Sequence, residues 1–132
     1  MTEIKKLAKK VRQAFEKIAE KEPCIGTDLC GLCARASIQL FLEARRKGMY
    51  VGLIAGTGHV YNTYKGHIID VTATQFGYKE KVLCVPISKL VTGAYNTRHG
   101  RIRSVKDLSK KAWRVPEYKI NNDREVVRQF VK

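Results

Sequence analysis

The sequence predicts an α+β fold, because helical segments come first, short apolar strand segments follow, and the two kinds are segregated along the chain. The length of 132 residues suits one domain that can bury a core of its own. Hydrophobic residues make up 44% and charged residues 29% of the chain, which excludes a disordered tail and a disulfide-packed miniprotein. We find no internal repeat and no linker, and therefore predict a single domain over residues 1–132.

Two segments have the periodicity of amphipathic helices. In residues 3–21, apolar side chains recur at steps of three and four with Lys and Glu between them, and Pro23 ends the pattern. Residues 24–31 contain two glycines and no periodicity, so we predict a loop there. A second helix is predicted over 32–47, followed by a C-terminal glycine cap at Gly48.

The middle of the chain predicts antiparallel strands. The dipeptide Lys65-Gly66 suits a tight turn between two strands of a hairpin, and Pro86 follows the last strand. The four predicted strands are 49–55, 59–64, 67–72 and 82–85. Short helices are predicted at 88–91, 105–113 and 123–131.

Three residues from separate elements could form a nucleophilic site. Cys33 lies in the first turn of the second predicted helix, where free N–H groups and the helix dipole stabilise a thiolate and can also hold an oxyanion. His59 begins one strand of the hairpin, and Asp70 lies near the end of the other. In such a triad the histidine takes the thiol proton, and the aspartate orients the ring and stabilises its protonated form.

The register of the hairpin selects between the histidines. If Lys65-Gly66 is a two-residue turn, His67 faces the residue before the turn, and Tyr61 faces Asp70. His59 and Asp70 then lie on one face as diagonal neighbours, close enough for the carboxylate to meet the imidazole. His67 lies on the opposite face, so the register favours His59 as the base.

These residues resemble the core of transglutaminase-like proteins within the papain-like superfamily. Residues 31–37 match its Gly-x-Cys helix start, and Gly48 matches the glycine that ends that helix before a strand. Residues 59–61 resemble its His-x-aromatic strand, and residues 66–73 its Gly…Asp-Pro-Thr strand. The continuation through residues 74–76 is similar to the Asp-Pro-Thr-Ala-x-Gln-Phe sequence of papain-fold bacterial toxins and effectors.

The resemblance covers about residues 26–77, which it implies are the catalytic core, with Cys33 as nucleophile, His59 as base and Asp70 as orienting acid. It implies a papain-like or transglutaminase-like arrangement, with the N-terminal helices packed on an antiparallel sheet. The family's chemistry comprises amide hydrolysis, glutamine deamidation, transamidation and peptide cleavage through an acyl-enzyme. We therefore expect a protein or peptide substrate, hydrolysis or deamidation as the reaction, and no cofactor.

The sequence departs from the family pattern at two positions. Val71 stands where the family often has Pro, and Tyr61 where it often has Trp. Tyr61 and Asn62 are candidates for the substrate cleft, although cross-strand packing explains Tyr61 equally well. Gln75 is a further cleft candidate, for which packing in the loop after Asp70 is the simpler explanation.

The other cysteines leave alternatives open. Cys30 lies one helical turn before Cys33 and is its rival as nucleophile or a cleft residue, although the Gly-x-Cys match favours Cys33. Four thiols could hold zinc in an adaptor, but a single C-x-x-C pair with two scattered cysteines is a poor ligand pattern, so we predict no metal. The same pair lacks the βαβ context of redox proteins. Cys24 and Cys84 are most simply structural thiols.

The formal net charge is +14, and residues 98–132 contribute eleven basic and four acidic residues to it, as a basic C-terminal extension. Such a charge attracts an acidic protein surface or nucleic acid. The alternative to an enzyme is therefore a basic binding module on an inactive papain-like scaffold. No secretory signal and no membrane-length apolar run is visible, which predicts a cytoplasmic protein without membrane contact, or one made in or delivered into a host cell.

Overall fold

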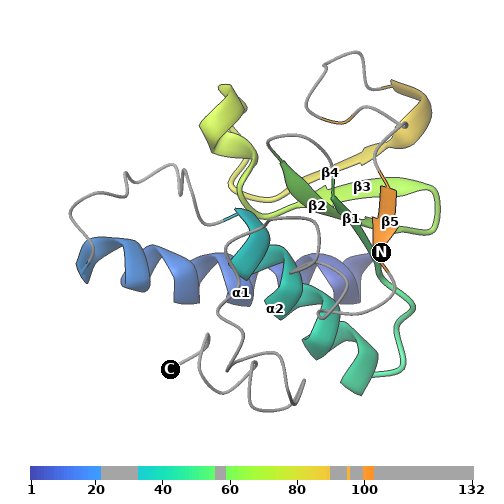
Figure 1. The fold of residues 1–132 in the computed structure, drawn as a ribbon, viewed down its shortest axis with the longest axis horizontal. Helices are drawn as coiled ribbons and strands as arrows, with labels where there is room; N and C mark the ends of the chain where they lie inside the picture. The colour runs from blue at the N-terminus through green and yellow to red at the C-terminus, as the bar shows by residue number, and fades with distance from the viewer. Residues whose placement is uncertain (22–32, 56–58, 90–94, 96–99, 103–132) are drawn as a thin grey trace.

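The computed structural model describes residues 1–21, 33–55, 59–89, 95 and 100–102, and it has two layers (Figure 1). Two N-terminal helices lie on one face of an antiparallel sheet, and the α+β prediction is confirmed. This layering suits both helices: the first has one apolar side to bury, and the second is buried along residues 36–42 without a break.

Helix α1 spans Thr2–Lys21 and helix α2 spans Cys33–Arg46, each within one residue of the predicted bounds. The buried side chains of α1 follow the three- and four-residue steps of its apolar pattern, ending at Ala19. Pro23 and the predicted loop 24–31 lie outside the described residues. Neither α1 nor α2 combines the length and the low charge that a membrane-crossing helix needs.

The end of α2 is capped as the glycine predicts. Gly48 has a φ of 76°, the left-handed region that favours glycine. Its N–H donates to the Arg45 carbonyl oxygen at 3.0 Å, and the N–H of Met49 donates to the Ala44 carbonyl oxygen at 2.9 Å. This pair of bonds is a Schellman motif. It turns the chain into the sheet, which is why the strand predicted from residue 49 begins only at residue 52.

The sheet has five antiparallel strands in the order β4-β3-β2-β1-β5. Their bounds are β1 Gly52–Ala55, β2 Val60–Tyr64, β3 His67–Asp70, β4 Leu83–Pro86 and β5 Gly100–Ile102. Strands β1 to β4 are consecutive neighbours, so short connections suffice. The short strand β5, which the sequence analysis did not predict, adds to the other side of β1.

Short 3₁₀ helices follow two of the strands. The predicted strand 67–72 ends at Asp70, and helix η1 spans Ala73–Phe76, closed by Gly77 with a φ of 87°. The 3₁₀ helix η2, Ile87–Lys89, covers the start of the helix predicted at 88–91, and residues 90 and 91 lie outside the described residues. The helices predicted at 105–113 and 123–131 lie outside the described residues.

The hairpin of β2 and β3 has the predicted register. Tyr64 pairs with His67, and Thr63 pairs with Ile68, so the turn contains only Lys65 and Gly66. Both turn residues have positive φ, 47° and 74°, as in a type I′ turn. The two-residue turn is therefore confirmed, and with it the alternation of faces on which the candidate site depends.

The sheet is buried on both faces. Its helix-facing side chains, such as Leu53, Val60 and Ile69, join α1 and α2 in the main core. On the opposite face a second, smaller cluster is formed by Tyr61, Ile68, Ala73, Leu83 and Tyr95. The candidate site lies where this second cluster meets the start of α2.

Candidate active site

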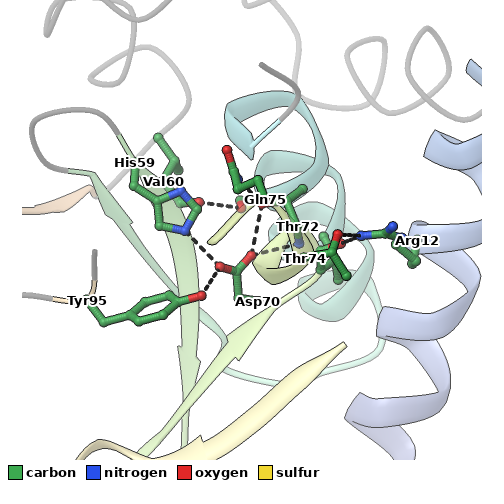
Figure 2. A network of polar contacts seen from close by, with 10 residues as sticks. Arg12, His59, Val60, Asp70, Thr72, Thr74, Gln75 and Tyr95 are labelled. Carbon is green, nitrogen blue, oxygen red and sulfur yellow. Dashed lines mark hydrogen bonds and ion pairs between the residues drawn. The ribbon is translucent and has the colours of Figure 1, made fainter. Parts of the chain in front are cut away.

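His59 and Asp70 are in direct contact. His59 immediately precedes β2, Asp70 ends β3, and the imidazole Nε2 lies 2.7 Å from Asp70 Oδ2 (Figure 2). The register explains this, because the two residues project from one face as diagonal neighbours across the hairpin. The predicted contact between the carboxylate and the imidazole is thus confirmed.

Asp70 is fully buried and held from both sides. Its Oδ1 accepts hydrogen bonds from the backbone N–H of Thr72 at 2.8 Å and from the Thr72 hydroxyl at 3.0 Å. Gln75 Nε2 donates in turn to the Thr72 hydroxyl oxygen at 2.9 Å. The other carboxylate oxygen, Asp70 Oδ2, accepts hydrogen bonds from the Tyr95 hydroxyl at 2.5 Å and from His59 Nε2. A carboxylate has about four acceptor positions, so all of them are used.

Aromatic rings surround His59, which is 2% exposed. Tyr61 stacks on it with ring centroids 5.6 Å apart, while Phe76 and Tyr95 meet it edge-on at 4.6 Å and 5.5 Å. Tyr61 and Tyr95 are buried, but Phe76 is 41% exposed. Phe76 therefore forms the boundary between the histidine and solvent on the side of η1.

The surroundings of His59 favour its protonated form. Burial lowers the pKa of His59, but the hydrogen bond to Asp70, the contact with Cys33 and the charges of both groups outweigh it and raise the pKa from 6.5 to about 9. Its second ring nitrogen, Nδ1, is buried and has no hydrogen-bond partner within the described part of the chain. That nitrogen is the one available to exchange a proton with a neighbouring group.

Cys33 is the first residue of α2 and is close enough to His59 to affect its pKa. The thiol is free, and the residue is 6% exposed at the edge of the main core. The start of a helix offers free N–H groups and a partial positive charge there. The structure therefore brings Cys33, at the start of α2, close to the His59–Asp70 pair of the hairpin.

The remaining candidates occupy different positions. Tyr61 lies in the site, and Gln75 supports it indirectly through Thr72. Asn62 lies away from it: its Nδ2 donates to the carbonyl oxygens of Ser37 and Gly52 at 3.1 Å and 3.2 Å, and it is fully buried. Asn62 therefore ties β2 to α2 and β1, and nothing of it reaches a cleft surface.

Two of the four cysteines can be placed. Cys84 is half-buried in β4 and free, whereas Cys24 and Cys30 lie outside the described residues. Among residues 1–21, 33–55 and 59–89, no group of three or more His, Cys, Asp or Glu side chains could hold a metal ion.

Two residues that support the site were missed in the sequence. Tyr95, which the sequence analysis did not single out, is buried against Asp70. No periodic pattern connects it to the hairpin, so no signal pointed to it. Arg12 is 3% exposed and donates through Nη1 to the Val71 carbonyl oxygen and the Thr74 hydroxyl, both at 3.0 Å. The sequence did hold a signal for Arg12: it follows Val11 directly and so lies next to the apolar face of α1, where a side chain can be buried.

A cavity of about 390 Å³ lies on another part of the surface, between α1 and the segment before β4. Lys81 Nζ lies 3.0 Å from Glu16 Oε2 there, so opposite charges neutralise each other along its wall. The cavity is lined by Lys9, Arg12, Gln13, Glu16, Glu80, Lys81 and Val82, and so by no member of the triad. The cavity is therefore separate from the site formed by Cys33, His59 and Asp70.

No protein-family model, no curated protein and no solved structure matches the chain.

Proposed function

We propose that this protein is a cysteine-dependent amide hydrolase or acyltransferase that acts on a protein or peptide. One observation carries the proposal: His59 binds Asp70 through Nε2, while its buried Nδ1 lacks a hydrogen-bond partner among the described residues and the Cys33 thiol lies near the same ring. A histidine held by an acid on one side and free toward a thiol on the other can act as a general base.

In the first step, the Cys33 proton passes to His59 Nδ1, leaving a thiolate beside an imidazolium whose Nε2–H donates to Asp70. The high pKa of His59, about 9, supports this proton transfer at neutral pH. The thiolate then attacks the carbonyl carbon of the substrate amide. The free N–H groups that a helix start offers would stabilise the resulting oxyanion.

In the second step, the tetrahedral intermediate collapses. Nδ1–H of His59 protonates the leaving nitrogen, the C–N bond breaks, and a thioester to Cys33 forms. Water then gives a proton to His59 Nδ1 and attacks the thioester, which frees the acid and restores the thiol. With a glutamine side chain as substrate the leaving group is ammonia, and with an amine in place of water the product is a new amide.

The order of elements supports placing the fold near the papain-like and transglutaminase-like proteins. The cysteine begins a helix, the histidine begins a later strand, and the aspartate ends the next strand of the same hairpin. Residues 31–37 and 66–73, which carry the resemblance, contribute the cysteine and the aspartate. We propose residues 26–77 as the catalytic core and hydrolysis or deamidation as its reaction.

The proposal is tested by the rate at which iodoacetamide alkylates each thiol in the folded chain at pH 7. Cys33 should react faster than Cys84, because a neighbouring imidazolium and a helix start stabilise its thiolate. Peptide mapping by mass spectrometry separates the two sites. Cys84 is a matched control, since it is free, lies in the same chain and is more exposed than Cys33.

Two variants complete the labelling experiment. His59→Gln and Asp70→Asn should slow alkylation of Cys33 and leave Cys84 unchanged, with folding checked by circular dichroism. If Cys33 reacts no faster than Cys84, or if both variants leave its rate intact, the proposed chemistry is wrong.

To determine which reaction is catalysed, the substrate must first be identified. A Cys33→Ala chain should retain partners that the active chain converts, and mass mapping of a captured partner after adding the active chain identifies the reaction. A gain of about one mass unit on Gln indicates deamidation, a cut chain indicates hydrolysis of the backbone, and a cross-link indicates transamidation.

A second candidate function is binding of an acidic protein or nucleic acid by the basic surface. The observation that favours it is the exposed side of α1, which carries the lysines Lys5, Lys6, Lys9, Lys10, Lys17 and Lys21. This function predicts an affinity that falls steeply with salt and that survives Cys33→Ala. Binding isotherms at two salt concentrations distinguish it from catalysis.

A further inference from the structure

Asp70 Oδ2 serves two donors at once. The Nε2–H of His59 lies 2.7 Å from it and the Tyr95 hydroxyl 2.5 Å, and all three side chains are at most 3% exposed (Figure 2). The triad chemistry described above uses the first of these bonds and leaves the second unexplained. A buried tyrosine hydroxyl needs a partner, and the Thr72 groups that hold the carboxylate bind only its other oxygen, Oδ1.

Two donors on one oxygen compete for its negative charge. A hydrogen bond from a neutral hydroxyl spreads part of the carboxylate charge onto the phenol, so less of it acts on the imidazole. In buried surroundings this effect is larger than in water, because the dielectric constant is low. The tyrosine responds in the same sense: burial, the Asp70 charge and the hydrogen bond raise the pKa of Tyr95 far above its usual value, so it stays a neutral donor.

We propose that Tyr95 is a positioning residue for the His59–Asp70 pair, whose hydroxyl holds Asp70 Oδ2 in line with the imidazole and limits the negative charge that this oxygen presents to it. The effect of Tyr95 on catalysis rests on the proposed function. Without the hydroxyl, His59 would hold its proton more tightly and return it less readily to a leaving nitrogen.

The groups around His59 define what the test must control. Asp70 faces it from β3, Cys33 from α2, Tyr61 from β2, and Tyr95 from its own segment. Helix η1 contributes the uncharged ring of Phe76, and the cation of α1 on this side, Arg12, donates to the Val71 carbonyl oxygen and the Thr74 hydroxyl. Of these groups, the Cys33 thiol is the one whose role belongs to the proposed reaction, so the test replaces it.

The test is therefore an NMR titration of the His59 ring nitrogens in the Cys33→Ser chain, with and without Tyr95→Phe. Phenylalanine keeps the ring that packs against Tyr61 and Phe76 and removes only the hydroxyl. We expect Tyr95→Phe to raise the pKa of His59 by roughly half a unit or more. Tyr78→Phe is the matched control: Tyr78 also packs on Tyr95, and its hydroxyl makes none of the hydrogen bonds that Asp70 accepts within the described residues.

An unchanged or lowered pKa of His59 in Tyr95→Phe overturns the inference, as does an equal rise in Tyr78→Phe. A measurement on the unsubstituted chain covers the case in which Tyr95→Phe does not fold. In the NMR spectrum of the unsubstituted chain, the Tyr95 hydroxyl proton should give a downfield resonance that exchanges slowly with solvent. If this resonance is absent, the inference is also overturned. Both readouts are independent of turnover. If the Cys33 labelling experiment fails and the titration succeeds, the proposed function is lost and the role of Tyr95 at the pair is retained.

Discussion

Arg12 on α1 and Val71, the residue directly after Asp70, are joined by a hydrogen bond of 3.0 Å from the guanidinium to the backbone carbonyl oxygen. The same Nη1 reaches the Thr74 hydroxyl in η1. The first helix thereby holds the segment that continues from the triad aspartate. This connects the N-terminal layer of the fold to the candidate site through one buried side chain.

Replacing Arg12 should therefore destabilise the fold. Arg12→Met keeps an unbranched apolar side chain but leaves the Val71 carbonyl oxygen buried without its guanidinium donor, at a cost of about 2 kcal/mol in the free energy of unfolding. Urea denaturation followed by circular dichroism measures it. The control is Lys81→Met, which breaks an exposed ion pair with Glu16 and should cost less than about 1 kcal/mol. Equal losses in the two variants would contradict the assigned role of Arg12.

The pKa of His59 predicts how stability depends on pH. The folded value of about 9 exceeds the unfolded value of 6.5, so protonated His59 contributes stability that is fully present below pH 6.5 and is lost as pH rises through 9. The contribution is up to about 3 kcal/mol. In urea unfolding from pH 6 to pH 9.5, the stability advantage of the unsubstituted chain over His59→Gln should shrink as pH rises. An advantage that stays constant or grows would refute the raised pKa.

The turn residue Lys65 is a site for stabilisation. Its φ of 47° is unfavourable for a residue with a side chain, whereas Asn tolerates this region and Asn-Gly is the preferred type I′ pair. Lys65→Asn should raise the free energy of unfolding by roughly 0.5 kcal/mol, which appears as a higher urea midpoint at an unchanged slope. Gly66→Ala, at a φ of 74°, should lower the midpoint instead. If both variants moved the midpoint the same way, the positive φ of the turn would be wrong.

Phe76 should control the access of water to the histidine. Its ring lies edge-on, 4.6 Å from the imidazole, and is the exposed member of the aromatic surroundings. In Phe76→Ala the Nε2 proton of His59 should exchange with solvent several-fold faster, because the shield is gone while Asp70 still accepts it. Line widths of that proton in NMR spectra give the rate. Phe76→Leu restores most of the cover and should restore slow exchange, and an effect of the same size in both variants would rule out shielding.

Much of the fold could be predicted because local signals agree with the tertiary structure. The apolar steps of α1, the glycine after α2 and the turn dipeptide each specify one element, and each element is found within a few residues of its prediction. Two strand boundaries differ from the prediction, each because a hydrogen-bonded cap or side chain takes the backbone out of the sheet. The strand before residue 52 is shortened by the Schellman motif, and the strand after residue 67 ends where Asp70 binds the Thr72 backbone.

The contact at the centre of the candidate site could also be predicted, since period-two alternation and a two-residue turn determine which side chains face each other. The rest of the site could not. Tyr95 approaches Asp70 from a segment without periodicity, and Arg12 approaches from a helix whose position depends on packing of the whole core. Asn62 shows the opposite error, because a polar residue beside Tyr61 suggested a cleft, whereas alternation turns it under α2.

The turn between β2 and β3 also limits how this protein can change over evolutionary time. Insertions and deletions are usually tolerated in such a surface turn. Here the gain or loss of one residue would shift the register, so that the side chains of one strand would point to the opposite face of the sheet. A descendant could then keep His59 and Asp70 and still have the imidazole and the carboxylate on opposite faces of the sheet. The proposed chemistry therefore requires a constant number of residues between His59 and Asp70 in related chains.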